Sequence, residues 1–377
     1  MKNLFKYIFV FIAPFLWLVG CSDSEGAQDD FLTRAVEFDV RFDKTPGDGS
    51  AGNGVLDDYF IDGRSVILIS QRGASLSINF NDYNIDNEGN QTVNENLYKY
   101  VYYTNPSADW DNNYNFQPYG NRALDWALME KESLNGEYVL GALYYPVEYN
   151  VNNSVEADQS NYENLLRSNI LGAWHKTHEA KSRLRFRFYH LMEAIRVTLL
   201  IPDWNPADNS GFGEDAAESA TLLGIIKDFT IGWSLDNSTE IPPNAQYIRE
   251  EQSCDIKMYL ETVDNDVQTI NFHDITPSFP DEVESVRKAT FVVLFPPQQP
   301  ATTAMRFILK TMGGMEKNYV WNTNNMYDST MKSEGGQINN LILYIPRKGN
   351  NAILLKAHIM DWMDAESQFT VIPDDMD

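Results

Sequence analysis

The chain has 377 residues, of which 29 are Lys or Arg and 54 are Asp or Glu, so its formal net charge is −25. This charge argues against a nucleic-acid-binding protein, which needs a dense cationic surface. Hydrophobic residues make up 43% and aromatic residues 13% of the chain. This composition excludes a disordered or collagen-like chain and predicts a globular protein with a hydrophobic core.

The first twenty residues differ in composition from the rest. Lys2 and Lys6 precede an apolar stretch at 7–19, and Gly20 stands directly before Cys21. These features resemble a bacterial lipoprotein signal, in which the cysteine is acylated and becomes the new N-terminus. We therefore predict a signal peptide at 1–20, a lipid such as palmitate on Cys21, and a location on the outer membrane at the cell surface. The alternative is an uncleaved anchor helix, for which the apolar run is short.

Residues 21–35 have the composition of an acidic tether. Residues 22–30 are small or acidic and should remain solvated. This stretch looks like the acidic segment that sends some lipoproteins of the Bacteroides group to the cell surface. Once Cys21 is acylated, Cys254 is the one thiol left, so no internal disulfide can form.

From residue 36 onward the dominant hydrophobic period is two. Residues 76–80, 183–188 and 195–201 alternate apolar with polar side chains, which gives each strand one dry and one wet face. Further strand-like runs are 66–70, 97–103, 138–145, 229–233, 256–260, 291–295, 305–310, 338–345 and 353–360. Many short strands separated by Gly, Pro, Asn and Asp predict an all-β protein built from β-sandwiches.

Helical periodicity is limited to two segments. Residues 161–174 place Tyr and Leu at helical spacing, and 281–288 are predicted to form a short helical turn with acids at its start. We interpret both as connectors and place a domain boundary near residue 180, with an uncertainty of about ten residues. The predicted domains are an N-terminal β-sandwich at 36–180 and a C-terminal β-sandwich at 181–377.

Glycine-rich and acidic segments do not form a nucleotide or calcium motif. Residues 47–52 match a dinucleotide-binding glycine pattern, but Pro46 precedes them and neither a strand nor a helix is predicted there. Residues 82–88 alternate acidic and amide side chains, but Asn87 stands where a calcium loop requires glycine. We interpret both segments as loops.

Histidines, the free thiol and clustered aromatics are further candidates for a site. His175 and His178 are three residues apart and would face one ion on a helix, but four committed ligands are not evident. Cys254 lacks a catalytic signature and is interpreted as a buried small hydrophobe. Tyr144 and Tyr145 could form a platform for a sugar ring, although core packing is the simpler explanation. We therefore predict no enzyme, no metal site and no cofactor.

An ordered set of segments resembles a known family. It consists of Thr-Arg-Ala-Val-Glu-Phe at 33–38, Gly-Glu-Tyr-Val-Leu-Gly-Ala-Leu-Tyr-Tyr-Pro at 136–146, the run at 184–197, Gly-Gly-Gln at 335–337 and Asp-Trp at 361–362. Together with the lipoprotein leader, this pattern resembles the fimbrillin-like subunits of type V pili from the Bacteroides group. The resemblance implies two transthyretin-like β-sandwich domains in tandem and assembly into surface fimbriae.

The resemblance also implies assembly by strand donation, in which a protease removes an N-terminal strand after an arginine. An open sheet edge has unpaired amides and carbonyls that a strand from another subunit can satisfy. Arg34, which stands before Ala35, is the leading candidate for the cleaved bond, and Arg41 and Arg64 are alternatives.

The tail at 367–372 provides a candidate donor strand. It alternates through Phe369 and Val371 and is stopped by Pro373. The alternative is an ordinary last strand of the C-terminal sandwich. We predict a stalk, anchor or tip subunit whose partners are other fimbrial subunits, the outer membrane through the lipid, and a host or glycan ligand. A surface glycan-binding lipoprotein is the alternative function.

Overall fold

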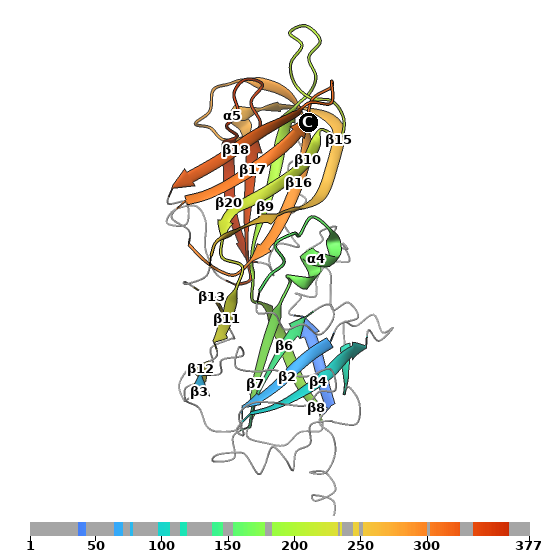
Figure 1. The fold of residues 1–377 in the computed structure, drawn as a ribbon, viewed down its shortest axis with the longest axis vertical. Helices are drawn as coiled ribbons and strands as arrows, with labels where there is room; N and C mark the ends of the chain where they lie inside the picture. Colours follow the sequence, from blue (N-terminus) through green and yellow to red (C-terminus); the bar gives the residue numbers. More distant parts are fainter. Residues whose placement is uncertain are drawn as a thin grey trace, which may run out of the picture.

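The structure is a computed structural model. It describes residues 37–42, 64–70, 76–77, 97–105, 114–118, 138–145, 154–177, 183–232, 234–235, 244–248, 252–299, 302–324 and 335–361. The described chain is all-β, as predicted, with two short helices, α4 (Tyr162–Arg167) and α5 (Phe272–Ile275). Figure 1 shows two β-domains stacked along the long axis of the molecule, with α4 between them.

The first β-domain is a closed ring of seven strands in the order β1-β5-β4-β2-β6-β7-β8. Its strands are β1 (Glu37–Phe42), β2 (Arg64–Ser70), β4 (Leu97–Asn105), β5 (Tyr114–Pro118), β6 (Tyr138–Tyr145), β7 (Leu171–Thr177) and β8 (Arg183–His190). Hydrogen-bonded pairing therefore continues around the whole sheet, which differs from the two separate sheets expected of an N-terminal sandwich.

The second β-domain contains two sheets packed face to face. The five-stranded sheet has the order β15-β16-β9-β19-β20, and the four-stranded sheet has the order β14-β10-β17-β18. Their bounds are β9 (Glu193–Pro202), β10 (Ala217–Ile225), β14 (Cys254–Lys257), β15 (Tyr259–Asn271), β16 (Val283–Phe295), β17 (Thr302–Lys310), β18 (Glu316–Asn324), β19 (Gln337–Tyr344) and β20 (Ile353–Asp361). We call this domain the sandwich.

Two small pairs of strands complete the described chain. β11 (Phe229–Gly232) pairs with β13 (Asn244–Tyr247), and β3 (Leu76–Ser77) pairs with β12 (Ser234–Leu235). No helix among the described residues has the length and apolar character required to cross a membrane.

The predicted alternation places the core of the sandwich between its two sheets. In β9, Ile195, Val197 and Leu199 are fully buried, whereas Arg196 and Thr198 are partly exposed on the other face. The large fully buried side chains that fill the core include Phe291, Phe295, Phe307 and Tyr319. A smaller cluster, formed by Leu200, Phe272, Val286, Tyr344 and Leu355, lies on the outer face of the five-stranded sheet under α5.

Both predicted helices differ from the structure. The helix expected at 161–174 ends at Arg167, and Leu171–Thr177 is a strand that pairs with β6 and β8. The turn expected at 281–288 lies mostly in β16, which begins at Val283. β16 is paired along its length with β9 on one side and β15 on the other, and this pairing outweighs the local helical preference.

The chain changes from one β-domain to the other more than once. β8 ends in the ring at His190 and β9 begins in the sandwich at Glu193. The segment 154–170, which precedes β7, already pairs with sandwich residues through bridges at Ser154 and Asp158. The predicted boundary near residue 180 remains a prediction, because the described residues near it belong to strands that enter and leave the ring.

Candidate functional site

β1 is the first strand of the described chain, and it is paired on both of its edges. It lies between β5 and β8 in the ring, antiparallel to β5 and parallel to β8. Its six residues, Glu37–Phe42, pair in register with 183–188, whereas two of them pair with β5. Because β1 is bordered on both sides, its removal would leave two strand edges that face one another.

The register of β1 matches residue types across the pair. Phe38 stands opposite Leu184, Val40 opposite Phe186 and Phe42 opposite Phe188. Paired residues share one face of a sheet, so the apolar positions of both strands fall on the same face. Any strand that replaced β1 would need an apolar residue at every second position.

At one side of the sandwich, the polypeptide chain itself joins the edges of the two sheets. β14 belongs to the four-stranded sheet and β15 to the five-stranded sheet, and only Met258 separates them. The Met258 amide donates to the Ala220 carbonyl of β10 at 2.9 Å. One nearly continuous strand therefore passes from sheet to sheet at this side.

At the opposite side of the sandwich, the edge strands of the two sheets are β18 and β20. We call the boundary between these two edges the seam. Val320 of β18 donates to the Asn350 carbonyl at 2.8 Å and accepts from the Ala352 amide at 2.9 Å. These two bonds join the middle of β18 to the turn that precedes β20, so the seam is tied where β20 begins.

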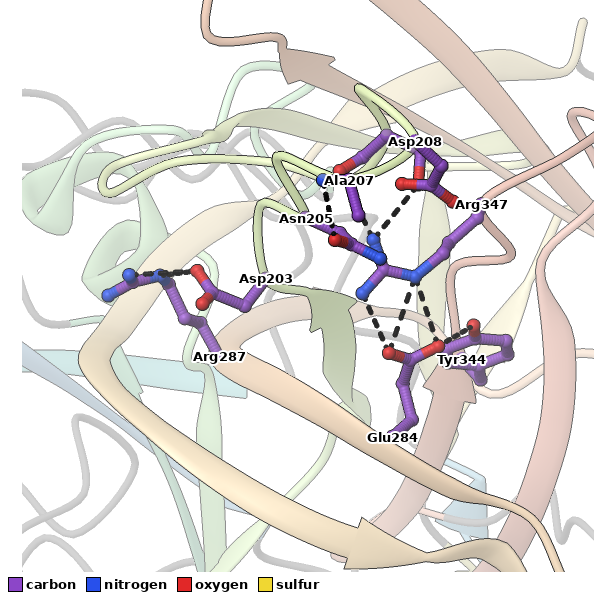
Figure 2. Close-up of polar contacts among 9 residues, drawn as sticks. Asp203, Asn205, Ala207, Asp208, Glu284, Arg287, Tyr344 and Arg347 are labelled. Carbon is purple, nitrogen blue, oxygen red and sulfur yellow. Dashed lines mark hydrogen bonds and ion pairs between the residues drawn. The ribbon is translucent and has the colours of Figure 1, made fainter.

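A polar cluster ties the loop at 203–213 to the outer edge of the sandwich (Figure 2). Arg347 Nη2 lies 2.7 Å from Glu284 Oε1, and Arg347 Nη1 donates to the carbonyl and the hydroxyl of Ser210 at 3.1 and 3.2 Å. The Tyr344 hydroxyl donates to Glu284 Oε2 at 3.1 Å. The cluster thus joins the start of β16, the end of β19 and a loop that follows β9.

A second ion pair holds the base of the same loop. Arg287 on β16 donates to Asp203 Oδ1 from Nε at 3.1 Å and from Nη2 at 2.9 Å, and it also donates to the Asn265 carbonyl. Figure 2 shows this pair beside the Arg347 cluster and separate from it. The loop is therefore fixed at its first residue and near its end at Ser210.

Neighbouring groups shift several pKa values in the cluster. The Ser210 hydroxyl lowers the pKa of Asp208, to which it donates at 2.7 Å. Burial, together with the adjacent Glu284 carboxylate, raises the pKa of Tyr344 well above its ordinary value. The hydrogen bond to Glu284 raises the pKa of Arg347. Tyr344 therefore stays neutral and Arg347 charged, which suits a structural cluster and provides no activated nucleophile or general base.

The described residues do not form a metal site. No group of three or more His, Cys, Asp or Glu side chains gathers in the part of the chain that the structure describes. His175 lies in β7, a strand, and not in the helix on which His175 and His178 would face one ion. His178 itself lies outside the described residues.

Most of the predicted site residues lie outside the described residues. This holds for Cys21, Arg34, Ala35, Phe369 and Val371.

The other candidates lie on strands. Tyr144 and Tyr145 lie in β6, opposite Ser65 and Arg64 of β2. Cys254 is half-buried at the start of β14, and burial raises the pKa of its thiol.

Sequence reasoning missed a group of buried polar side chains where the two β-domains meet. Gln159, Glu193 and Asn339 are almost completely buried, and Asn339 Nδ2 donates to Glu193 Oε1 at 2.9 Å. His190 Nδ1 lies 2.9 Å from Asn169 Oδ1, and burial lowers the pKa of His190 to about 3. The sequence signal for such a buried polar side chain is a polar residue within an apolar run, such as Glu193 directly before Ala194 and Ile195.

Comparisons with known proteins found similarity only among solved structures. No family model matches the chain, and no curated protein matches it. A proposed cell adhesion protein from Bacteroides uniformis is 14% identical, with a TM-score of 0.43, and the match covers 87% of this chain and 97% of that one. One from Bacteroides ovatus is 13% identical with a TM-score of 0.44 and coverages of 87% and 98%.

The fimbrial anchor protein Mfa2 from Porphyromonas gingivalis is also similar. It is 8% identical, with a TM-score of 0.30, and the match covers 88% of this chain and 99% of that one. These three structures are thus two proposed cell adhesion proteins and one fimbrial anchor protein.

Proposed function

We propose that this protein is a non-enzymatic structural subunit of a surface fimbria that assembles by strand exchange, with β1 as the strand that leaves. The observation that carries the proposal is the position of β1. It is the first described strand of the chain and is held between β5 and β8 by backbone pairing. A first strand can leave the ring without threading the chain, and it leaves two complementary edges behind.

The position of the cut decides whether β1 can leave. A cut after Arg34, the leading candidate, precedes Glu37 and keeps β1 attached to the rest of the chain. A cut after Arg41 divides β1, whereas a cut after Arg64, the first residue of β2, separates all of β1 from the ring. Release of all of β1 therefore requires a cut beyond Phe42, and of the three candidate arginines only Arg64 meets this condition.

The tail supports a role as donor strand by its sequence. β1 contains Phe38-Asp39-Val40, and the tail contains Phe369-Thr370-Val371, so both present Phe and Val two residues apart. A tail that enters the place of β1 would repeat the apolar positions that face Leu184 and Phe186 in the present register.

The remaining features of the proposal follow from the sequence. They are a lipid on Cys21 that holds the protein at the outer membrane, two transthyretin-like β-domains in tandem, and an adhesive surface presented by the assembled fimbria.

The test uses protein that begins at Ser22, treated with an arginine-specific protease and followed by light scattering after size-exclusion chromatography. We expect a fragment containing β1 to dissociate and higher oligomers to form. An Arg64→Lys variant, which the protease does not cut at that bond, should remain monomeric. Truncation after Asp361 should allow cleavage but prevent oligomers. Strictly monomeric protein after release of β1 would contradict a role as a polymerising subunit.

A further inference from the structure

The segment 154–170 lies between two strands of the ring in the sequence, yet it is attached to the sandwich. Val155 donates to the Lys227 carbonyl at 3.0 Å and is buried in the sandwich core. Gln159 donates from its amide to the Lys257 carbonyl at 3.0 Å, and the Lys257 amide donates to Ala157 at 2.9 Å. We call residues 154–170 the strap.

The strongest attachment of the strap is the buried side chain of Gln159. Its Nε2 donates to the Leu294 carbonyl at 2.7 Å, and its Oε1 accepts from the Leu294 amide at 2.9 Å. The side-chain amide therefore pairs with the main chain of β16 as a peptide group of a neighbouring strand would. An exposed ion pair between Asp158 and Lys257, 2.7 Å long, lies beside it.

The strap is stiffened by bonds within itself. Asn161 caps α4 by accepting from the Asn164 amide at 2.9 Å, and Asn164 Nδ2 donates to the Asp158 carbonyl at 2.7 Å. The buried Ser168 hydroxyl accepts from the Glu156 amide at 3.0 Å. The two ends of the strap are thus tied together across α4, so the strap holds its shape as one piece.

Between β6 and β9 the described chain consequently passes between the two β-domains three times, apart from the later pairing of β12 with β3. It leaves the ring after β6, returns from the strap into β7, and leaves again from β8 into β9. The second and third passages run side by side, because Leu171 pairs with His190 and the Leu191 amide donates to the Ile170 carbonyl at 3.0 Å. Figure 1 shows α4 at this junction.

We propose that the strap locks the ring and the sandwich into one mechanical body. A single connecting chain lets two domains pivot, whereas paired passages fixed to a buried anchor restrict rotation about the junction. This coupling depends on the bonds of the strap and not on whether the chain is a fimbrial subunit. It predicts that loss of the Gln159 anchor frees the junction while both β-domains remain folded.

The sandwich contains a matched control for Gln159. Gln298 is also buried, and its side chain pairs with the main chain of Ile226, accepting from the amide at 3.1 Å and donating to the carbonyl at 2.8 Å. Both residues of this pair lie outside the strap. A Gln298→Leu variant therefore removes an equivalent pair of hydrogen bonds without touching the strap.

The experiment measures distances between spin labels by pulsed electron paramagnetic resonance in protein that begins at Ser22 and carries Cys254→Ala. One label replaces Lys99 in the ring and the other replaces Asn318 in the sandwich. Labels at Asn318 and Lys356, both in the sandwich, serve as the reference pair. We expect a narrow distribution between ring and sandwich in the parent and a width about two-fold greater in Gln159→Leu, with the reference pair unchanged.

Two outcomes overturn the proposal. One is a broad distribution in the parent, and the other is a width in Gln159→Leu no greater than in Gln298→Leu. If Gln159→Leu does not fold, Gln159→Asn replaces it, because it keeps a polar amide on a side chain one methylene shorter, which loses the paired bonds to Leu294. A width that Gln159→Asn leaves unchanged would then overturn the proposal.

Discussion

Replacing Arg347 with Met should destabilise the sandwich far more than the loss of an ordinary surface charge. The guanidinium of Arg347 is 2.7 Å from Glu284, and the two side chains are only 19% and 15% exposed. The same guanidinium holds Ser210, which lies near the end of the loop that Asp203 begins. Met has a similar length and replaces the packing of the aliphatic stem, so the variant mainly removes the polar contacts.

The magnitude follows from the burial of the pair. Breaking a fully buried ion pair costs about 3–5 kcal/mol, whereas exposed pairs contribute about 0–1 kcal/mol. This pair is mostly buried, and Glu284 keeps the hydroxyl of Tyr344 as a donor. We therefore expect a loss of about 2–3 kcal/mol, which corresponds to a decrease in Tm of about 4–12 °C for a domain of this size.

The assay is differential scanning calorimetry of the protein that begins at Ser22, with amide exchange at Phe212 to locate the effect in the loop. Arg306→Met is the control, because Arg306 is 3.9 Å from Asp255 and the two side chains are 45% and 54% exposed. That control should lose less than about 0.5 kcal/mol. If Arg347→Met shifts the Tm no more than Arg306→Met does, the reasoning about burial is refuted.

Three further outcomes are expected. Burial lowers the pKa of His190 to about 3, so as the pH falls the unfolded chain binds a proton at this histidine before the folded protein does. The contribution of His190 to stability is therefore full above pH about 6.5 and declines toward pH 3, by at most about 1.4 kcal/mol per pH unit. Denaturant titrations of His190→Asn should show a smaller decline over this range. Gly335→Ala places a methyl group 2.8 Å from the Leu191 carbonyl oxygen and should cost about 1–3 kcal/mol, whereas Gly313→Ala meets nothing closer than 4.0 Å and should be near neutral by the same calorimetry. Burial raises the pKa of the Cys254 thiol, so iodoacetamide should alkylate the folded protein more slowly than protein in urea, and equal rates would contradict this assignment.

Strict alternation made part of the fold predictable from the sequence. The run at 138–145 has the same bounds as β6, and the inward and outward positions of β9 follow the sequence. The sequence does not predict β18, because among 316–322 only Tyr319 and Trp321 are buried, and most of the other residues there are polar and exposed. Such a strand owes its structure to its pairing with β17, which local sequence does not reveal.

The polar contacts of the Arg347 cluster could not be predicted from local sequence patterns. Glu284, Arg347 and Ser210 are far apart in the sequence and meet only through the sheet order. The helix predicted at 161–174 is too long. Tyr162 and Leu165 do lie in a helix, but the same periodicity extends the prediction into β7. β7 is a strand because it pairs with β6 in the ring, and the sequence of β7 alone does not reveal this pairing.

The parallel pairing of β9 with β19 constrains how the polypeptide reaches its native state. β9 is the first strand of the sandwich and β19 is one of the last two, yet they are neighbours at the centre of one sheet. A nascent chain that emerges from its N-terminus carries β9 long before β19 exists, so one hydrogen-bonding edge of β9 has to await its partner. Contacts this distant along the chain slow folding, and the five-stranded sheet is complete only after β19 has been made.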